Sequence, residues 1–273
     1  MENITAARTA IDESMNTAND KNAELIFNNL QLYFCKDYTV KHKDSNGITI
    51  RQPRISDFVT YGEKTVYESV MPFISNPTSL RVQLWEKNID WNKITDYQLF
   101  SLLITNCNNE FTEHIFGDVD FSKFKMKPQG DINNFILHNE EQNIIIDENI
   151  YTCMAKYIQA MFCITLKTEY VKGRFNKEDT IREEKFELAH GKNKNAGANL
   201  STMISFCVNH PGFKYKLEEL ENIGIYAFMD SVNRLQIYES TSALMSGMYS
   251  GFCDTSKIDK EQFNFMRNIV EKR

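Results

Sequence analysis

The chain has 273 residues, of which 42% are hydrophobic and 12% aromatic, so it can bury a substantial core in one large or two small domains. Its 31 basic and 37 acidic residues give a net charge of −6, without the clustered basic residues that bind nucleic acid or an anionic membrane. We therefore expect neither nucleic acid nor membrane among its partners.

The six cysteines lie far apart in the sequence and form no CxxC pair, and no histidine stands at zinc-finger spacing. We therefore expect no metal and no cofactor. The N-terminal residues lack the basic start and apolar segment of a secretory signal, and no stretch reaches the roughly 20 apolar residues that cross a bilayer. These features predict reduced thiols in a cytoplasm.

The first predicted element is a β-hairpin. Residues 30–40 and 48–53 are rich in β-branched and aromatic side chains, and they flank Asn46-Gly47, where positive φ would allow a tight turn. Pro53 is expected to close the second strand, because proline cannot donate to a strand ladder.

Helices are predicted to follow. The run 54–74 should bend or break near Gly62 and stop at Pro72, and a further helical pattern occupies SLRVQLWEKNIDWNK. The next helix has a clear start signal, because Thr95 and Gln98 form a capping-box pattern.

Three short segments, FKMK, NFILH and NIII, are then separated by turn-forming residues and predict strands. The pattern becomes helical again at Asp147, with an apolar face made of Tyr151, Met154, Ala155, Ile158, Met161 and Phe162. The tract that follows is charged and then rich in Gly and Asn, which predicts a solvated helix ending at Gly191 and a mobile loop.

The last third repeats the pattern of buried amphipathic helices. One apolar stripe consists of Ile225, Phe228, Met229, Val232 and Leu235. Asp230 and Arg234 can pair across one helical turn. Asp259 and Gln262 form a second capping-box pattern, which predicts that the chain ends in a helix.

These patterns predict an α+β fold that is predominantly α-helical, with an N-terminal β-hairpin, a helical middle containing a few short strands, and a helical C-terminal lobe. The predicted organisation is a flexible arm over 1–24, a hairpin plus helical domain over 25–172, a charged helix and mobile loop over 173–199, and the helical lobe over 200–273.

Catalytic patterns are absent from the sequence. His114 lies near two glutamates, but a zincin-type site needs a second histidine four residues away. His210 precedes a proline at a helix end, where a turn or capping role is natural. Asp118 and Asp120 resemble a cation-binding pair, but the further ligands and glycine of an EF-hand loop do not follow, so we expect a capped turn. We assign no catalytic residue.

Aromatic side chains are the remaining clue. The chain has 19 Phe, 12 Tyr and 2 Trp, and aromatic residues are favoured at protein interfaces. The polar mixture around Tyr61, Tyr67, Trp85 and Trp91 makes these four candidates for a groove that binds an apolar helix of a partner.

Two stretches carry a resemblance to a known family. ITIRQPRISDFVTYGEKTVYESV with QLWEKNIDWNKITDYQLF, and FKYKLEELENIGIYAFMDSVNRLQ with GMYSGFCD, resemble tail assembly chaperones or minor tail proteins of phages infecting low-GC Gram-positive bacteria. The resemblance covers much of the chain, and its motifs are packing motifs that specify no activity.

The resemblance implies a non-enzymatic chaperone that binds the phage tape measure protein, or other tail proteins, in the host cytoplasm during tail assembly. The alternative is a structural component of the tail or baseplate, retained in the virion as a homo-oligomer. A third possibility, an enzyme of unfamiliar chemistry, has no recognisable nucleophile, base or metal set to support it.

Overall fold

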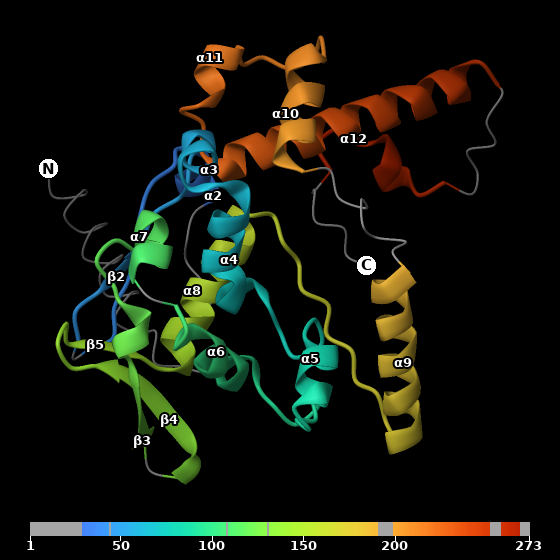
Figure 1. Cartoon of the computed structure of the whole chain (residues 1–273). Helices are drawn as coiled ribbons and strands as arrows, with labels where there is room; N and C mark the ends of the chain where they lie inside the picture. Colours follow the sequence, from blue (N-terminus) through green and yellow to red (C-terminus); the bar gives the residue numbers. More distant parts are fainter. Residues whose placement is uncertain are drawn as a thin grey trace, which may run out of the picture.

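The computed structural model describes residues 29–43, 45–107, 109–129, 131–190, 199–251 and 258–267 (Figure 1). Its helices are α2 (Asn29–Tyr33), α3 (Ile55–Tyr61), α4 (Glu63–Ile74), α5 (Arg81–Glu86), α6 (Asp96–Ile104), α7 (Asn109–Phe116), α8 (Glu148–Met161), α9 (Arg174–His190), α10 (Leu200–Asn209), α11 (Leu217–Leu220) and α12 (Ile225–Tyr249), with short 3-10 helices η1 (Phe121–Lys123) and η3 (Lys260–Phe263). Its strands are β1 (Tyr38–Val40), β2 (Ile48–Ile50), β3 (Lys125–Gln129), β4 (Asp131–Asn139) and β5 (Ile144–Ile146). The predicted fold class, predominantly helical α+β, is confirmed.

The N-terminal hairpin is present but shorter than predicted. β1 and β2 pair antiparallel, with Val40 opposite Ile48. The prediction of a strand from residue 30 was wrong, because residues 29–33 form α2 instead. Tertiary packing overrides the weak local strand preference here. Leu32 of α2 is fully buried, and its carbonyl accepts a hydrogen bond from Gln52 Nε2 at 3.0 Å.

The turn of this hairpin also differs from the prediction. Neither Asn46 nor Gly47 has a positive φ, so no tight two-residue turn forms there. The connection between the strands is longer, and Asn46 N donates to Asn143 O at 2.7 Å. A contact with the turn between β4 and β5 therefore shapes this loop.

Gly62 separates α3 from α4, as predicted. Its φ of 87° is readily adopted only by glycine, and this conformation ends one helix and begins the next. The prediction that the helix stops at Pro72 was wrong, since α4 continues to Ile74. Pro72 lies in the last turn of α4 and is buried; it lacks the N–H that would donate to the carbonyl four residues earlier, and the helix ends two residues after it.

The predicted capping box starts α6: Gln98 N donates to Thr95 Oγ1 at 3.1 Å, and Thr95 N donates to Gln98 Oε1 at 3.0 Å.

A small second core holds α9 against α5. The buried members of this second core are Val82, Leu84, Trp91, Leu99 and Ile181. In Figure 1, α9 lies beyond α5, at the side of the molecule away from the three-stranded sheet. It ends at His190, next to the predicted end at Gly191.

The three short segments predicted as strands form one antiparallel sheet in the order β3-β4-β5. Leu137 and Ile146 pair across β4 and β5, and both side chains are buried. The sheet therefore contributes one face to the main core.

The main core joins distant parts of the chain. The face predicted for α8 is buried, and in α12 the stripe residues Ile225, Phe228, Val232 and Leu235 belong to the same cluster, with Met229 packed against it. Phe73 of α4 and Phe100 of α6 are fully buried in it as well, 5.0 Å apart between ring centroids. This single cluster contains residues from both sides of the predicted boundary at 173–199.

Backbone hydrogen bonds connect residues 221–225, just before and at the start of α12, with residues 53–56, which follow β2. Three hydrogen bonds form the connection: Ile225 N to Pro53 O (2.9 Å), Ile55 N to Ile223 O (3.0 Å) and Ser56 N to Glu221 O (3.1 Å). Gly224 lies in this contact, and a Cβ placed on it would come within 2.1 Å of Gln52 Oε1. Glycine is needed at this position because the two segments approach so closely.

The C-terminal part differs from the prediction in one element. Residues 260–263 form a 3-10 helix, and Asp259 Oδ1 accepts from Glu261 N at 3.1 Å, so Asp259 caps it without a capping box. The predicted arm at 1–24, the mobile loop after Gly191 and the last residues of the chain lie outside the described residues. Within the described ranges, no helix is long and apolar enough to cross a membrane.

Candidate functional site

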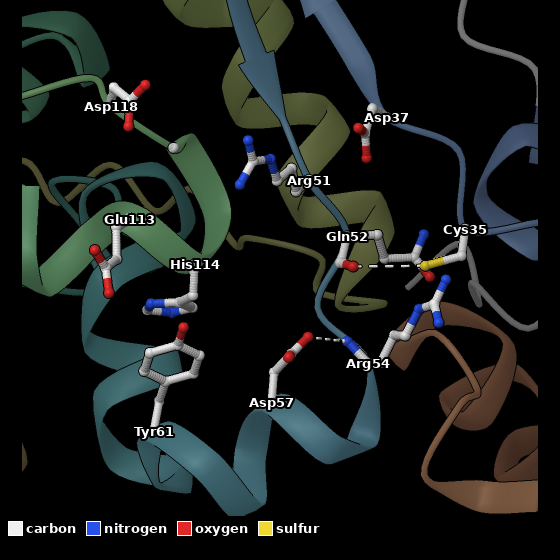
Figure 2. A pocket seen from close by; sticks show the side chains of 11 residues that line it. Cys35, Asp37, Arg51, Gln52, Arg54, Asp57, Tyr61, Glu113, His114 and Asp118 are labelled. Atoms are coloured by element: carbon white, nitrogen blue, oxygen red, sulfur yellow. Dashed lines mark hydrogen bonds between the residues drawn. The ribbon is translucent and has the colours of Figure 1, made fainter.

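A polar cavity of about 550 Å³ opens where the segment after β2 meets α3 and α7 (Figure 2). Arg51 and Arg54 come from the segment after β2, Tyr61 from α3, and His114 from α7. The backbone of Gly117, with a φ of 60°, forms part of the wall, and a Cβ there would approach Arg51 Nη2 to 3.2 Å. The cavity thus places two guanidinium groups near an imidazole and a phenol.

His114 is the most enclosed of these groups. Its ring stacks on Tyr61 with 4.8 Å between ring centroids, and Nε2 lies 3.2 Å from Ser69 Oγ. Burial lowers the pKa of His114, so its imidazole is held in the neutral form. Nδ1 is buried and has no hydrogen-bond partner in the described part of the chain. His114 therefore fills a packed position under Tyr61.

The charges of the cavity are mixed. Four carboxylates line it beside the two arginines: Asp37, Asp57, Glu113 and Asp118. Asp57 Oδ2 accepts from Arg54 N at 2.7 Å, so this carboxylate caps the start of α3. Within the described ranges neither guanidinium forms a side-chain ion pair. The excess of carboxylates over guanidinium groups does not favour an anionic ligand.

The thiol of Cys35 also borders the cavity. Burial raises its pKa, and its Sγ donates to Gln52 O at 3.5 Å. Figure 2 shows Cys35 and His114 on opposite sides of the cavity, so the imidazole is not placed to take the thiol proton. Activation of a cysteine by a histidine base requires the two to be within hydrogen-bond reach.

The other polar positions singled out in the sequence have structural roles. Asp120 Oδ1 accepts from Ser122 N at 3.1 Å at the start of η1, which is the capped turn that was predicted. His210 ends α10, where its Nδ1 accepts from Gly212 N at 3.0 Å and its Nε2 lies 3.1 Å from Glu239 Oε1. Among the described residues, no group of three or more His, Cys, Asp or Glu could hold a metal ion.

The structure does not bring Tyr61, Tyr67, Trp85 and Trp91 to one surface. Tyr61 is exposed beside the polar cavity, whereas Tyr67 packs between Phe58 and Phe162 in the main core. Trp85 and Trp91 meet edge to face at 5.7 Å between ring centroids in the second core, where Trp91 is only 2% exposed. Tyr61 is the most exposed of the four, at 38%, and its ring stacks on His114.

Exposed apolar side chains also occur in the C-terminal part of the chain. Eight large hydrophobic side chains there are exposed: Phe206, Val208, Tyr215, Leu217, Tyr238, Tyr249, Phe265 and Met266. The sequence patterns did not predict their exposure. One feature of the sequence could have indicated their exposure. An aromatic residue that falls outside the apolar stripe of a helix, as Tyr238 does in α12, is expected to face away from the core.

Three of these side chains, Tyr215, Tyr238 and Phe265, line a groove of about 560 Å³. Its apolar lining consists of Phe213, Tyr215, Leu235, Tyr238 and Phe265. The two charged residues that line it, Lys214 and Arg234, are both basic. Figure 1 shows α12 extending outward from the main body of the molecule.

Comparison with known proteins points to a phage origin. Residues 191–270 match the family described as the YomV second domain, a phage-derived family. The matched range includes α10, α11, α12 and η3, and therefore all eight of the exposed apolar side chains named above. No curated protein and no solved structure matches the chain. The match indicates a phage protein, and it covers less than a third of the chain.

Proposed function

We propose that this phage protein is a non-enzymatic tail morphogenesis factor that binds the tape measure protein during tail assembly in the host cytoplasm. The observation that carries the proposal is the set of eight exposed hydrophobic side chains within residues 199–267. These residues fall in the range that matches a phage-derived family. The resemblance of the sequence to tail assembly chaperones supplies the identity of the partner.

Exposed apolar area on both proteins is the physical basis for the proposed contact. Contiguous exposed apolar surface on a folded protein marks a site of contact with another molecule. A long helical partner with apolar faces tends to associate with itself before assembly. A protein that covers those faces keeps the partner in solution, and aromatic and methionine side chains suit such contacts because they provide large, adaptable apolar area.

The polar cavity supports the non-enzymatic part of the proposal. It contains a thiol whose pKa is raised and a neutral imidazole on the opposite side, so these two groups do not form a nucleophile and base pair.

The proposal is tested by co-expressing the protein with the tape measure protein of the same phage. We expect the soluble yield of the tape measure protein to rise and the two proteins to copurify, whereas an unrelated acidic protein of similar size should have neither effect. Mass spectrometry of purified virions distinguishes the two modes of action. A chaperone is absent from finished particles, and recovery of the protein in stoichiometric amounts would establish a structural component instead.

A further inference from the structure

We propose that the groove between α12, the segment after α10 and the segment after η3 is the docking site for one amphipathic helix of the partner, with acidic residues flanking its apolar face. This inference rests on the proposed function and narrows it to one surface and one kind of occupant. Tyr215 of the segment after α10, Tyr238 of α12 and Phe265 of the segment after η3 all line the groove.

The floor of the groove is rigid. Leu235 belongs to the main core and is 9% exposed, and Phe213 packs against the same core. Tyr238 and Phe265 contact each other on the rim, with 5.6 Å between ring centroids, and they are 56% and 39% exposed. Apolar side chains of an incoming helix would thus meet a preformed surface, which lowers the entropy lost on binding.

The extent of the apolar surface favours a helix over a small molecule. Leu217 and Met266, which follow the lining residues Tyr215 and Phe265 within two positions in the sequence, are 61% and 85% exposed. A small ligand in the groove would leave both uncovered. An amphipathic helix lying in an apolar groove covers such flanking residues with its successive turns.

The charge of the occupant follows from the basic lining. Lys214 is exposed and forms no ion pair with any described residue, whereas Arg234 Nε lies 3.9 Å from Asp230 Oδ1 and its Nη1 donates to Arg267 O at 2.7 Å. These basic groups border an apolar groove on a protein whose net charge is −6. Acidic residues beside the apolar face of the helix would complement them, which sets orientation and specificity.

The test measures binding of fluorescently labelled synthetic peptides, which cover the helical segments of the tape measure protein, to the full chain. Tyr238→Ala should weaken binding of the best peptide about tenfold or more, because exposed aromatic anchors dominate such interfaces. Tyr170→Ala is the matched control, since Tyr170 is 70% exposed, lies outside the set of eight exposed side chains and does not line the groove. A thermal melt of each variant verifies folding.

The charge component is tested independently. Lys214→Glu should weaken binding, and Lys167→Glu, which does not line the groove, should not. Replacing the acidic residues of the peptide by glutamine should reduce its affinity for the wild type. The same replacement should raise its affinity for Lys214→Glu, because it removes the repulsion from the introduced carboxylate.

The outcomes separate the two proposals. If the wild type binds the peptides and the groove variants bind equally well, the groove is not the site, while the proposed function stands. If the wild type binds neither the peptides nor the intact tape measure protein, both proposals fail. A dimer of the wild type that Tyr238→Ala dissociates would show that a second copy of the chain occupies the groove, and this would overturn the inference.

Discussion

Tyr33 Oη donates a hydrogen bond to Asp230 Oδ2 at 2.6 Å and so connects α2 with α12, 197 residues apart in the sequence. Asp230 is 8% exposed, and Arg234 Nε lies 3.9 Å from its Oδ1. The ring of Tyr33 also meets Tyr226 edge to face at 4.9 Å. A buried carboxylate without a close hydrogen-bond donor is costly, so this hydrogen bond, together with the ring contact to Tyr226, holds α2 against α12.

Tyr33→Phe should therefore lower the free energy of unfolding by about 1.5–3 kcal/mol, the range for a hydrogen bond to a charged group. Chemical denaturation of the two proteins measures the difference. Tyr170→Phe is the matched control, because Tyr170 is 70% exposed, and it should change stability little. Equal losses for both variants would show that the Tyr33 hydroxyl makes no specific contribution.

Val232→Asp should destabilise the protein by several kcal/mol out of a total of about 5–15 kcal/mol, because it places an unpaired carboxylate in the main core. Val232 is 5% exposed between other members of the buried stripe. Gln236→Asp, on the exposed side of the same helix, is the control. A melting temperature for Val232→Asp equal to that of the parent would contradict the burial of this face.

Gly224→Ala should destabilise the protein by about 1–3 kcal/mol through overpacking. The added Cβ would lie 2.1 Å from Gln52 Oε1 and 3.0 Å from Cys35 Sγ, although the φ of −65° suits any residue. The effect is therefore steric. If so, Gln52→Ala combined with Gly224→Ala should cost less than the sum of the two single changes, as a double-mutant cycle by denaturation can measure. Strict additivity would argue against the clash.

Stability should fall with rising pH above pH 9.0. Burial raises the pKa of the Cys163 thiol from 9.0 to about 11. Between these values the unfolded chain has released this proton while the folded protein still holds it, so the unfolded state is favoured as the pH rises. Denaturation across this window should show a decreasing free energy of unfolding, and the decrease should be shallower in Cys163→Ala. An identical slope in the variant would mean that other groups, such as Tyr38 with its pKa raised to about 12, account for the fall.

Local chemistry explains which predictions were correct. The capping box at Thr95 and Gln98 needs only residues three positions apart, and the apolar faces of α8 and α12 follow from a helical repeat within one segment. The strands β3, β4 and β5 were likewise marked by short apolar runs between turn residues. Each of these signals is contained in a short window of sequence.

The candidate sites were harder to predict because they combine distant segments. The polar cavity brings Arg51 beside Gly117, and the groove places Tyr238 against Phe265, each pair joined only by the tertiary fold. The polar residues around Trp91 in the sequence, which made it a candidate for partner binding, cannot tell a buried ring from an exposed one, and the structure buries it against Trp85. Its role in partner binding was therefore a weaker prediction than the fold.

The sequence by itself determined the fold class, the helical repeats and the capping of individual helices, because backbone propensity and side-chain periodicity act within a few residues. Only the tertiary structure decided that residues 29–33 form a helix, that Gly224 must lack a side chain beside Gln52, and that Tyr238 faces outward. These outcomes depend on which surfaces meet across the chain, and the free energy of such contacts exceeds the small local preferences that a sequence pattern records.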